Sequence, residues 1–360
     1  MERYQAKLGG VKAHLHNLWH FGVMCFGTWG NAIASLTWLL LFSVLIIPLV
    51  QWGVLRAMWY GSVEQCHQDG ACWVYISKNG FQLMYGLYPK TEIWRINTLL
   101  LAIGLQLLLI WQVKRQSVRM VLGAFLIVLM PPLTYTIAIG GVWGLVFVPP
   151  QYWGGLALNL LFSTLSIACA LPLGLLLAIA RKSRWGVYST IAKVIIDCIR
   201  GLPLVSILFF GGLILPFLFH YQSSEKIIRL FVVFTVFGAA YMAEAIRAGL
   251  QSVGPGQHEA AEVLGFSKTK AAIFIIIPQA LEIALPSLMN LVIALLKDST
   301  LLSTIAVLDI VGMMQATTAR VEWMPYAVEA YVMVGLVFWL LCYGLSLVSY
   351  AIEKRIKISR

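Results

Sequence analysis

The sequence has little charge and none of the motifs that are typical of soluble enzymes. Only 11% of its 360 residues are charged, less than half of the roughly 25% that is usual in soluble domains. It has no GxxxxGK[ST] phosphate-binding loop, the usual nucleotide-binding motif of ATPases and GTPases. HExxH, CxxC and GxSxG are also missing, and the six histidines are scattered. We therefore expect neither a catalytic site nor a metal site.

Long apolar runs dominate the sequence instead. Sixty per cent of the residues are hydrophobic, and the mean hydropathy is +0.84. A helix needs roughly 20 apolar residues to cross about 30 Å of hydrocarbon. Eight runs come close to this length, at about 31–53, 97–113, 120–141, 153–180, 188–218, 227–249, 273–297 and 326–350. The sequence therefore predicts an all-α integral membrane protein with about eight transmembrane helices.

The basic residues behind the net charge of +11 are arranged according to the predicted spans. This arrangement argues against nucleic-acid binding. Lysine and arginine gather on one side of the eight-helix arrangement. They are Arg3, Lys7, Lys12, Lys114, Arg115, Arg119, Arg181, Lys182, Arg184, Lys268, Lys270, Lys354, Arg355, Lys357 and Arg360. Because loops rich in these residues stay in the cytoplasm, we expect both termini to be cytoplasmic.

A polar stretch, EAAEVLGFSKTKAAIFIIIP at 259–278, interrupts the apolar pattern between the sixth and seventh spans. Pro255 suits a first helical position, and Gly265 can end that helix with a positive φ angle. Ser267 is a suitable N-cap for the next helix, so the stretch predicts a helix, a glycine turn and a second helix. The first helix could dock into a groove on another protein or simply rest on the lipid headgroups.

The spacing within this stretch resembles the EAA loop of bacterial ABC importer permeases. The loop covers about 252–278 here, and Ile277 stands where leucine is usual before the proline. In that family the loop docks onto a cytoplasmic ABC ATPase dimer, which binds ATP and Mg. The resemblance implies coupling roles for Glu259, Ala260, Ala261, Gly265 and Pro278.

Three further segments are similar to permeases for polar amino acids: RGLPL at 200–204, AYMAE at 240–244 and ALLKDSTL at 294–301. The resemblance implies that residues 151–360 form the five-helix core of a type I ABC importer permease. Residues 1–150 resemble the N-terminal extension of the longer membrane subunit of general L-amino acid importers. They would supply three transmembrane helices and a large periplasmic loop.

The expected function is translocation of amino acids, with a broad range of L-amino acids, across the bacterial inner membrane. The family implies a periplasmic amino-acid-binding protein and a second permease subunit, which we expect to form a heterodimer, although a homodimer stays open. Two other classes compete: a passive channel, and a membrane-embedded enzyme acting on lipid or acyl substrates through His258 and Glu259. An ATPase-docking loop has no role in a passive channel, and it already accounts for His258 and Glu259.

Ionisable residues within membrane spans are costly and often line a substrate path. Lys297 and Asp298 lie at the outer end of the seventh span, and Glu244 lies near the inner end of the sixth. A zwitterionic amino acid could place its carboxylate on Lys297 and its amine on Asp298. Hydrogen bonds to the substrate could come from Ser299, Thr300, Asn159 and Thr164. Alternatively, Lys297 and Asp298 pair with each other or reach toward the membrane interface.

Cys66 and Cys72 fall in the large loop outside the cytoplasm. That compartment is oxidising, and the two residues are close in sequence, so we expect a disulfide. Two free thiols are the alternative.

Overall fold

The computed structural model describes residues 24–66, 69–113, 115–183, 185–219 and 225–358. Across these residues the regular structure is helical, with only isolated bridges between extended residues. The chain divides into two compact units, Met1–Ser77 and Lys78–Arg360, which are described separately. The sequence predicts a different division, with an N-terminal extension at 1–150 and the permease core at 151–360. That division stays a prediction.

The first unit contains one long apolar helix, α2 (Trp29–Val50), which continues as a π-helical turn at Gln51–Leu55. No residue of this helix is buried within the unit. The loop that follows contains a short 3₁₀ turn, Val63–Gln65. It is held by a hydrogen bond of 2.8 Å from the Met58 N–H to the Ala71 carbonyl, and a disulfide joins Cys66 to Cys72. Helix α3 (Val74–Tyr85) begins at the end of this unit and continues into the second.

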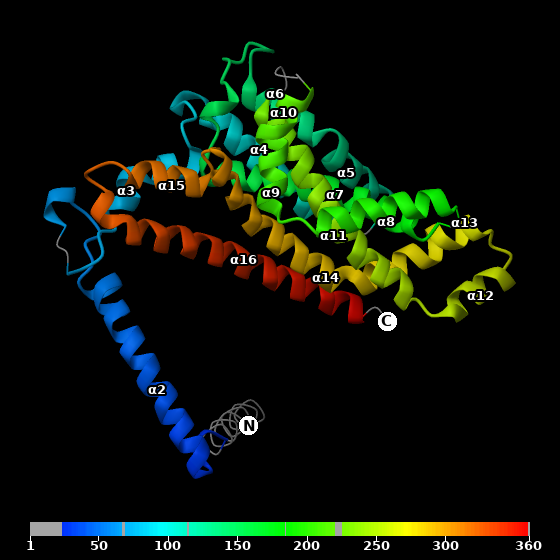
Figure 1. The fold of residues 1–360 in the computed structure, drawn as a ribbon, viewed down its shortest axis with the longest axis horizontal. Coiled ribbons are helices and arrows are strands. Elements are labelled where there is room, and N and C mark those ends of the chain that lie inside the picture. The colour runs from blue at the N-terminus through cyan, green and yellow to red at the C-terminus, as the bar shows by residue number, and fades with distance from the viewer. Residues whose placement is uncertain (1–23, 67–68, 114, 184, 220–224, 359–360) are drawn as a thin grey trace, which may run out of the picture. The chain divides into compact units, whose positions relative to one another are not determined.

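The second unit consists of the remaining helices (Figure 1). Before the long central pair come η3 (Lys90–Glu92), α4 (Ile93–Gln112), α5 (Gln116–Val128), α6 (Met130–Ile139) and η4 (Pro150–Tyr152). Then follow α7 (Gly155–Arg181), α8 (Gly186–Arg200), α9 (Leu204–Phe209), η5 (Phe210–Ile214), α10 (Leu215–Phe219) and α11 (Lys226–Ser252). The chain ends with α12 (Pro255–Val263), α13 (Lys268–Ala271), η6 (Ala272–Ile276), α14 (Ile277–Asp298), η7 (Ser299–Ile305), α15 (Ile310–Thr318), η8 (Met324–Tyr326) and α16 (Ala327–Ile358).

Among the described residues, six helices are long and apolar enough to cross a membrane, and two bent helix pairs raise the total to as many as eight. This agrees with the predicted all-α membrane fold. The run at 188–218 was expected as one helix and instead bends by 104° between α8 and α9. Pro203 stands at the break, and proline has no N–H to continue a helix and disfavours the helical conformation for the residue before it. The run at 120–141 bends by 44° between α5 and α6, next to Pro131 and Pro132.

Helices α7 and α11 form the centre of the second unit, and α14 packs on α11 and on α16. The two central helices approach closely because small residues lie between them. A Cβ on Gly174 of α7 would come within 2.9 Å of the Ala239 carbonyl oxygen of α11. Such small-residue contacts are the usual way in which membrane helices pack tightly.

Helices α4 and α6 pack against the other side of α7 and share a buried apolar cluster with it. Two hydrogen bonds fix the ends of these elements. The Tyr88 hydroxyl donates to the Ala138 carbonyl at 2.8 Å, and the Arg95 guanidinium donates to the Val146 carbonyl at 2.8 Å. Residues 78–150 therefore belong to the same compact unit as the helices that follow them.

We expect Gly249→Ala to destabilise the second unit. A Cβ at this position of α11 would overlap the backbone carbonyl oxygen of Ala280 on α14, and such overpacking typically lowers the free energy of unfolding by about 1–3 kcal/mol. Thermal unfolding of the purified protein in detergent measures the effect. Gly335→Ala on α16 is the control, because no atom lies within 4 Å of its added Cβ. Equal unfolding temperatures for both variants would contradict the close approach of α11 and α14.

We expect non-reduced protein to contain Cys66 and Cys72 as one linked pair. Alkylation followed by peptide mass spectrometry should leave both residues unlabelled until a reductant is added. Cys198, which is exposed and unpaired in the structure, serves as the positive control for labelling. Labelling of both loop cysteines without reduction would contradict the pairing.

Candidate functional site

The polar stretch between α11 and α14 folds as the predicted helix, glycine turn and helix. Helix α12 begins with Pro255 and ends before Gly265, whose φ angle is +77°. The Gly265 N–H donates to the Glu262 carbonyl at 2.9 Å, and the Phe266 N–H donates to the Ala261 carbonyl at 3.0 Å. These bonds close the end of α12 in the manner of a glycine C-cap. Ser267 then caps α13 by accepting from the Lys270 N–H at 3.4 Å.

Helix α12 is anchored on one face and exposed on the other. Ala261 is buried, and the Gln279 side chain of α14 donates to the Gln257 side chain of α12 at 3.0 Å. Val263 and Leu264 are 87% and 72% exposed. Large apolar side chains at the end of a short polar helix form a surface suited to contact with another protein. Among the residues predicted to act in coupling, Glu259 and Ala260 are exposed and Ala261 is part of the anchor.

A π-helical turn connects this loop to α14. It spans Ala272–Ile276, and the Ile277 N–H donates to the Ala272 carbonyl five residues earlier. Pro278 follows at the start of α14. Because proline has no N–H and its ring crowds the carbonyl four residues back, the wider turn lets the helix pass this residue without ending. The loop and α14 are thus one continuous helical path, interrupted only at Gly265.

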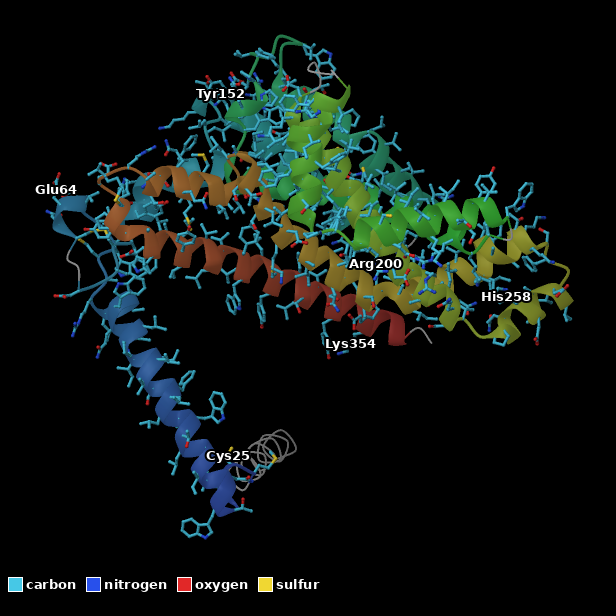
Figure 2. All side chains as sticks on the ribbon, viewed as in Figure 1. Cys25, Glu64, Tyr152, Arg200, His258 and Lys354 are labelled. Atoms are coloured by element: carbon cyan, nitrogen blue, oxygen red, sulfur yellow. A yellow bond between two sulfur atoms is a disulfide. The ribbon has the colours of Figure 1, made fainter. Side chains whose placement is uncertain are left out.

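A cluster of arginines surrounds Glu244 toward the α12 end of the unit. One carboxylate oxygen lies 3.1 Å from Arg181 of α7 and 3.7 Å from Arg200 of α8, and the other accepts from Arg247. Arg181 also lies 3.2 Å from Asp197 of α8. Figure 2 shows Arg200 at the end of α8. A single glutamate thus joins the ends of three helices, and its negative charge separates three positive ones.

A second polar cluster lies at the opposite end, where α7 begins beyond Tyr152 (Figure 2). The Asn159 amide donates to the Ser299 hydroxyl at 3.0 Å and to the Asp309 carboxylate at 3.2 Å. Its carbonyl oxygen accepts from the Ile310 N–H at 3.0 Å. Asn159, Ser299 and Asp309 are each 0% exposed. One amide therefore connects α7, η7 and the start of α15.

Asp309 was not among the predicted site residues. It is the N-cap of α15 and accepts from the Gly312 N–H at 2.8 Å. An aspartate directly before an apolar helical run is a recognisable N-cap signal, so the sequence contained a cue for this role. Its contact with Asn159, 150 residues earlier, had no such cue.

The remaining predicted path residues do not join one pocket. Lys297 is exposed and Asp298 is half-buried, and no salt bridge within 4.0 Å joins the two. The Thr300 hydroxyl donates to the Lys297 carbonyl at 2.7 Å, and Thr164 is half-buried on α7. The structure thus brings Asn159 and Ser299 together and places Glu244 in the arginine cluster near α12. A role of these residues in substrate transport stays a prediction.

Residues 170–358 match the family of binding-protein-dependent transport system inner membrane components. The chain belongs to this family. It is 37% identical to the inner membrane amino-acid ABC transporter permease protein YhdY of Escherichia coli K12, over 93% of this chain and 92% of that protein. It is 30% identical to the glutamate/glutamine/aspartate/asparagine transport system permease protein BztC of Rhodobacter capsulatus, over 80% of this chain and 79% of that protein.

A solved structure, titled a crystal structure of an amino acid ABC transporter with histidines, has a similar fold. The TM-score is 0.51 and the sequence identity 29%, over 56% of this chain and 92% of that one. Together these similarities identify the chain as a membrane permease subunit of a binding-protein-dependent transporter, not an enzyme. Neither the membrane-enzyme nor the passive-channel alternative finds support among them.

We expect the stability of this permease to depend on the protonation of Asp309, which lies outside the membrane-spanning helices. Burial raises the pKa of its carboxyl from 3.8 to about 6, although hydrogen bonds from Gly312 and Asn159 act in the opposite direction. The folded protein therefore binds this proton more tightly than the unfolded chain. The ionised carboxyl therefore lowers the free energy of unfolding. This loss is complete above about pH 6 and disappears as the carboxyl is protonated between about pH 6 and 3.8.

Thermal unfolding measured between about pH 7 and pH 5 should show the unfolding temperature rising as the pH falls. Asp309→Asn should remove the part of this pH dependence that is due to Asp309, since an asparagine side chain does not titrate. Asp69→Asn is the control, because Asp69 is an exposed aspartate in the first unit. An unchanged slope in Asp309→Asn would mean that Asp309 does not bind its proton more tightly in the folded protein.

Proposed function

We propose that this chain is the translocating subunit of an ATP-driven importer of L-amino acids, coupled to a cytoplasmic ATPase dimer through α12. The observation that carries the proposal is the exposed, rigidly anchored α12 on a chain whose relatives are amino-acid permeases. ATP and Mg would be bound by the partner ATPases, since nucleotide binding in this family belongs to that subunit. The chain itself contains no GxxxxGK[ST] loop.

The geometry of the loop supports a mechanical role. The hydrogen bond between Gln257 and Gln279 ties α12 to the first turn of α14, and the π-helical turn keeps α13 continuous with α14. A displacement of α12 by closing ATPases would therefore move α14 as a rigid body rather than bend a flexible loop. The ATPases can favour one conformation of the permease only if they bind that conformation more tightly than the other.

The placement of basic residues supports an orientation with α12 and both termini in the cytoplasm. In that orientation, the cluster around Glu244 faces the cytoplasmic side. The Asn159, Ser299 and Asp309 cluster lies toward the periplasm, where a binding protein would deliver substrate. Residues 1–150 would form an extension with three transmembrane helices, ahead of the transporter core at 151–360.

A second permease subunit completes the proposed pore. Two different relatives from Bacillus subtilis, the probable glutamine permease proteins GlnM and GlnP, are 32% and 31% identical to this chain. Two related permeases in one organism are consistent with subunits that assemble in pairs, and we propose a heterodimer for this chain.

Recognition of the amino-acid backbone would explain a broad substrate range. The relatives' names include glutamate, asparagine and cystine, whose side chains share little chemistry. The carboxylate that all three share could bind Lys297, and the shared amine could bind Asp298. Lys297 and Asp298 form no salt bridge with each other. Because Asn159 and Ser299 already bond to each other, we propose that they shape the wall of the path and that Thr300 and Thr164 offer further hydrogen bonds.

We expect Gly265→Val to damage coupling more than Glu259→Gln. Valine strongly disfavours the positive φ angle of this position, whereas Glu259 is exposed and an exposed ion pair contributes only about 0–1 kcal/mol. The measurement is ATP hydrolysis by the complex in lipid vesicles, with and without loaded binding protein. Gly265→Asn is the matched control, because asparagine tolerates the left-handed conformation and should retain most of the stimulation. Normal stimulation in Gly265→Val would remove the case for a coupling loop.

We expect Lys297→Met and Asp298→Asn each to reduce amino-acid uptake strongly while leaving assembly intact. Each change removes the charge proposed to meet one charged group of the substrate. Uptake of radiolabelled amino acids into vesicles that contain the whole complex measures the effect. Lys193→Met serves as the control, because Lys193 is an exposed lysine on α8, away from the proposed path. Transport at the wild-type rate by both path variants would leave the binding role without support.

A further inference from the structure

A cavity of about 350 Å³ lies within the second unit, where α6, α7 and α11 meet. Its α7 wall is formed by five residues over about two helical turns: Ala157, Leu158, Leu161, Phe162 and Leu165. Pro132 of α6 and Ile228 of α11 line it as well and are exposed. The opening therefore lies between α6 and α11 and faces the surroundings of the helices, which for a membrane permease are the lipid chains.

The dimensions of the cavity match part of one lipid leaflet. From Ala157 to Leu165 the α7 wall rises by eight residue steps, or roughly 12 Å of helix. The hydrocarbon of one leaflet is about 15 Å deep. The cavity begins near the end of the membrane-spanning helices, since Trp153, just before α7, also lines it. It is therefore a slot along the helices that starts near the membrane surface and ends near mid-bilayer.

The chemistry of the lining changes along this slot. Tyr85, Tyr88, Tyr135 and Trp153 contribute to it near the outer end, as aromatic residues do at the level of lipid headgroups. Deeper in, the lining on α7 is wholly apolar and consists of Leu161, Phe162 and Leu165. None of the lining residues carries a charge, so a zwitterionic amino acid would find no partner here, and water would find few.

We propose that this cavity binds one acyl chain of a membrane phospholipid. A cavity of this volume is more than twice the roughly 150 Å³ that holds a benzene-sized guest, and close-packed interiors leave few voids larger than a water molecule. The lipid would fill the space between α6, which precedes the proposed transporter core, and α7 and α11 within it. It would thereby hold the earlier helices against the core.

The test uses the assembled complex in vesicles of phosphatidylethanolamine and phosphatidylglycerol that contain a small fraction of a phospholipid with a diazirine on one acyl chain. After illumination, peptide mass spectrometry locates the labelled residues. We expect label on the cavity walls of α6, α7 and α11 in excess of the label on the exposed face of α16 at Trp339 and Leu340. Label on the cavity walls no stronger than on α16 would overturn the proposal. So would cavity walls that become labelled only when the second permease is absent, because a partner helix would then occupy the slot.

Ala157→Phe should fill the slot and lower labelling of its walls severalfold, with labelling of α16 unchanged. Ala124→Phe on α5 is the matched control, because Ala124 is exposed and does not line the cavity. Unchanged wall labelling in Ala157→Phe would also overturn the proposal.

Discussion

Helix α11 lies against α7 along much of its length, and most other elements of the second unit are positioned by this pair. Small residues allow the approach, since Gly174 leaves room for the α11 backbone and Gly249 leaves room for that of α14. Nearer the N-terminal ends of the two helices, Phe162 of α7 packs edge-on against Phe231 and Phe234 of α11. In a bilayer, where lipid tails are as apolar as the side chains, this close packing replaces the hydrophobic driving force that folds soluble bundles.

Polar clusters fix both ends of this helix pair. Near α12, Glu244 brings α7, α8 and α11 together through arginines. Near α15, Asn159 bonds to Ser299 and Asp309. Between the clusters the helix contacts are mainly apolar and depend little on exact partners. In the clusters, specific hydrogen bonds and ion pairs must break before the helix ends can move. A helix bundle arranged in this way is suited to two discrete states, because polar contacts repack between alternatives rather than stretch.

The α12 loop and the proposed lipid slot adjoin this bundle at different places. Helix α12 is attached to α14 through Gln257 and Gln279, so a force applied to α12 reaches a helix that packs directly on α11. The slot borders α7 and α11 on the side of α6. A lipid chain there would brace the side of the pair that must stay in place while α14 moves.

The amino-acid sequence by itself determined that the chain is helical and membrane-embedded, because apolar runs of this length have no other stable arrangement of their backbone hydrogen bonds in a bilayer. It also determined the helix, glycine turn and helix at 255–271, since Pro255, Gly265 and Ser267 act through local backbone rules that need no distant contact. Pro203 accounts locally for the break before α9, whereas the tertiary structure alone decided the direction of that 104° bend. It also decided that Asp309 meets Asn159 and that Glu244 meets Arg181 and Arg200 on two other helices. These partners come together only when helices far apart in sequence pack at one angle and register, which local sequence patterns do not specify.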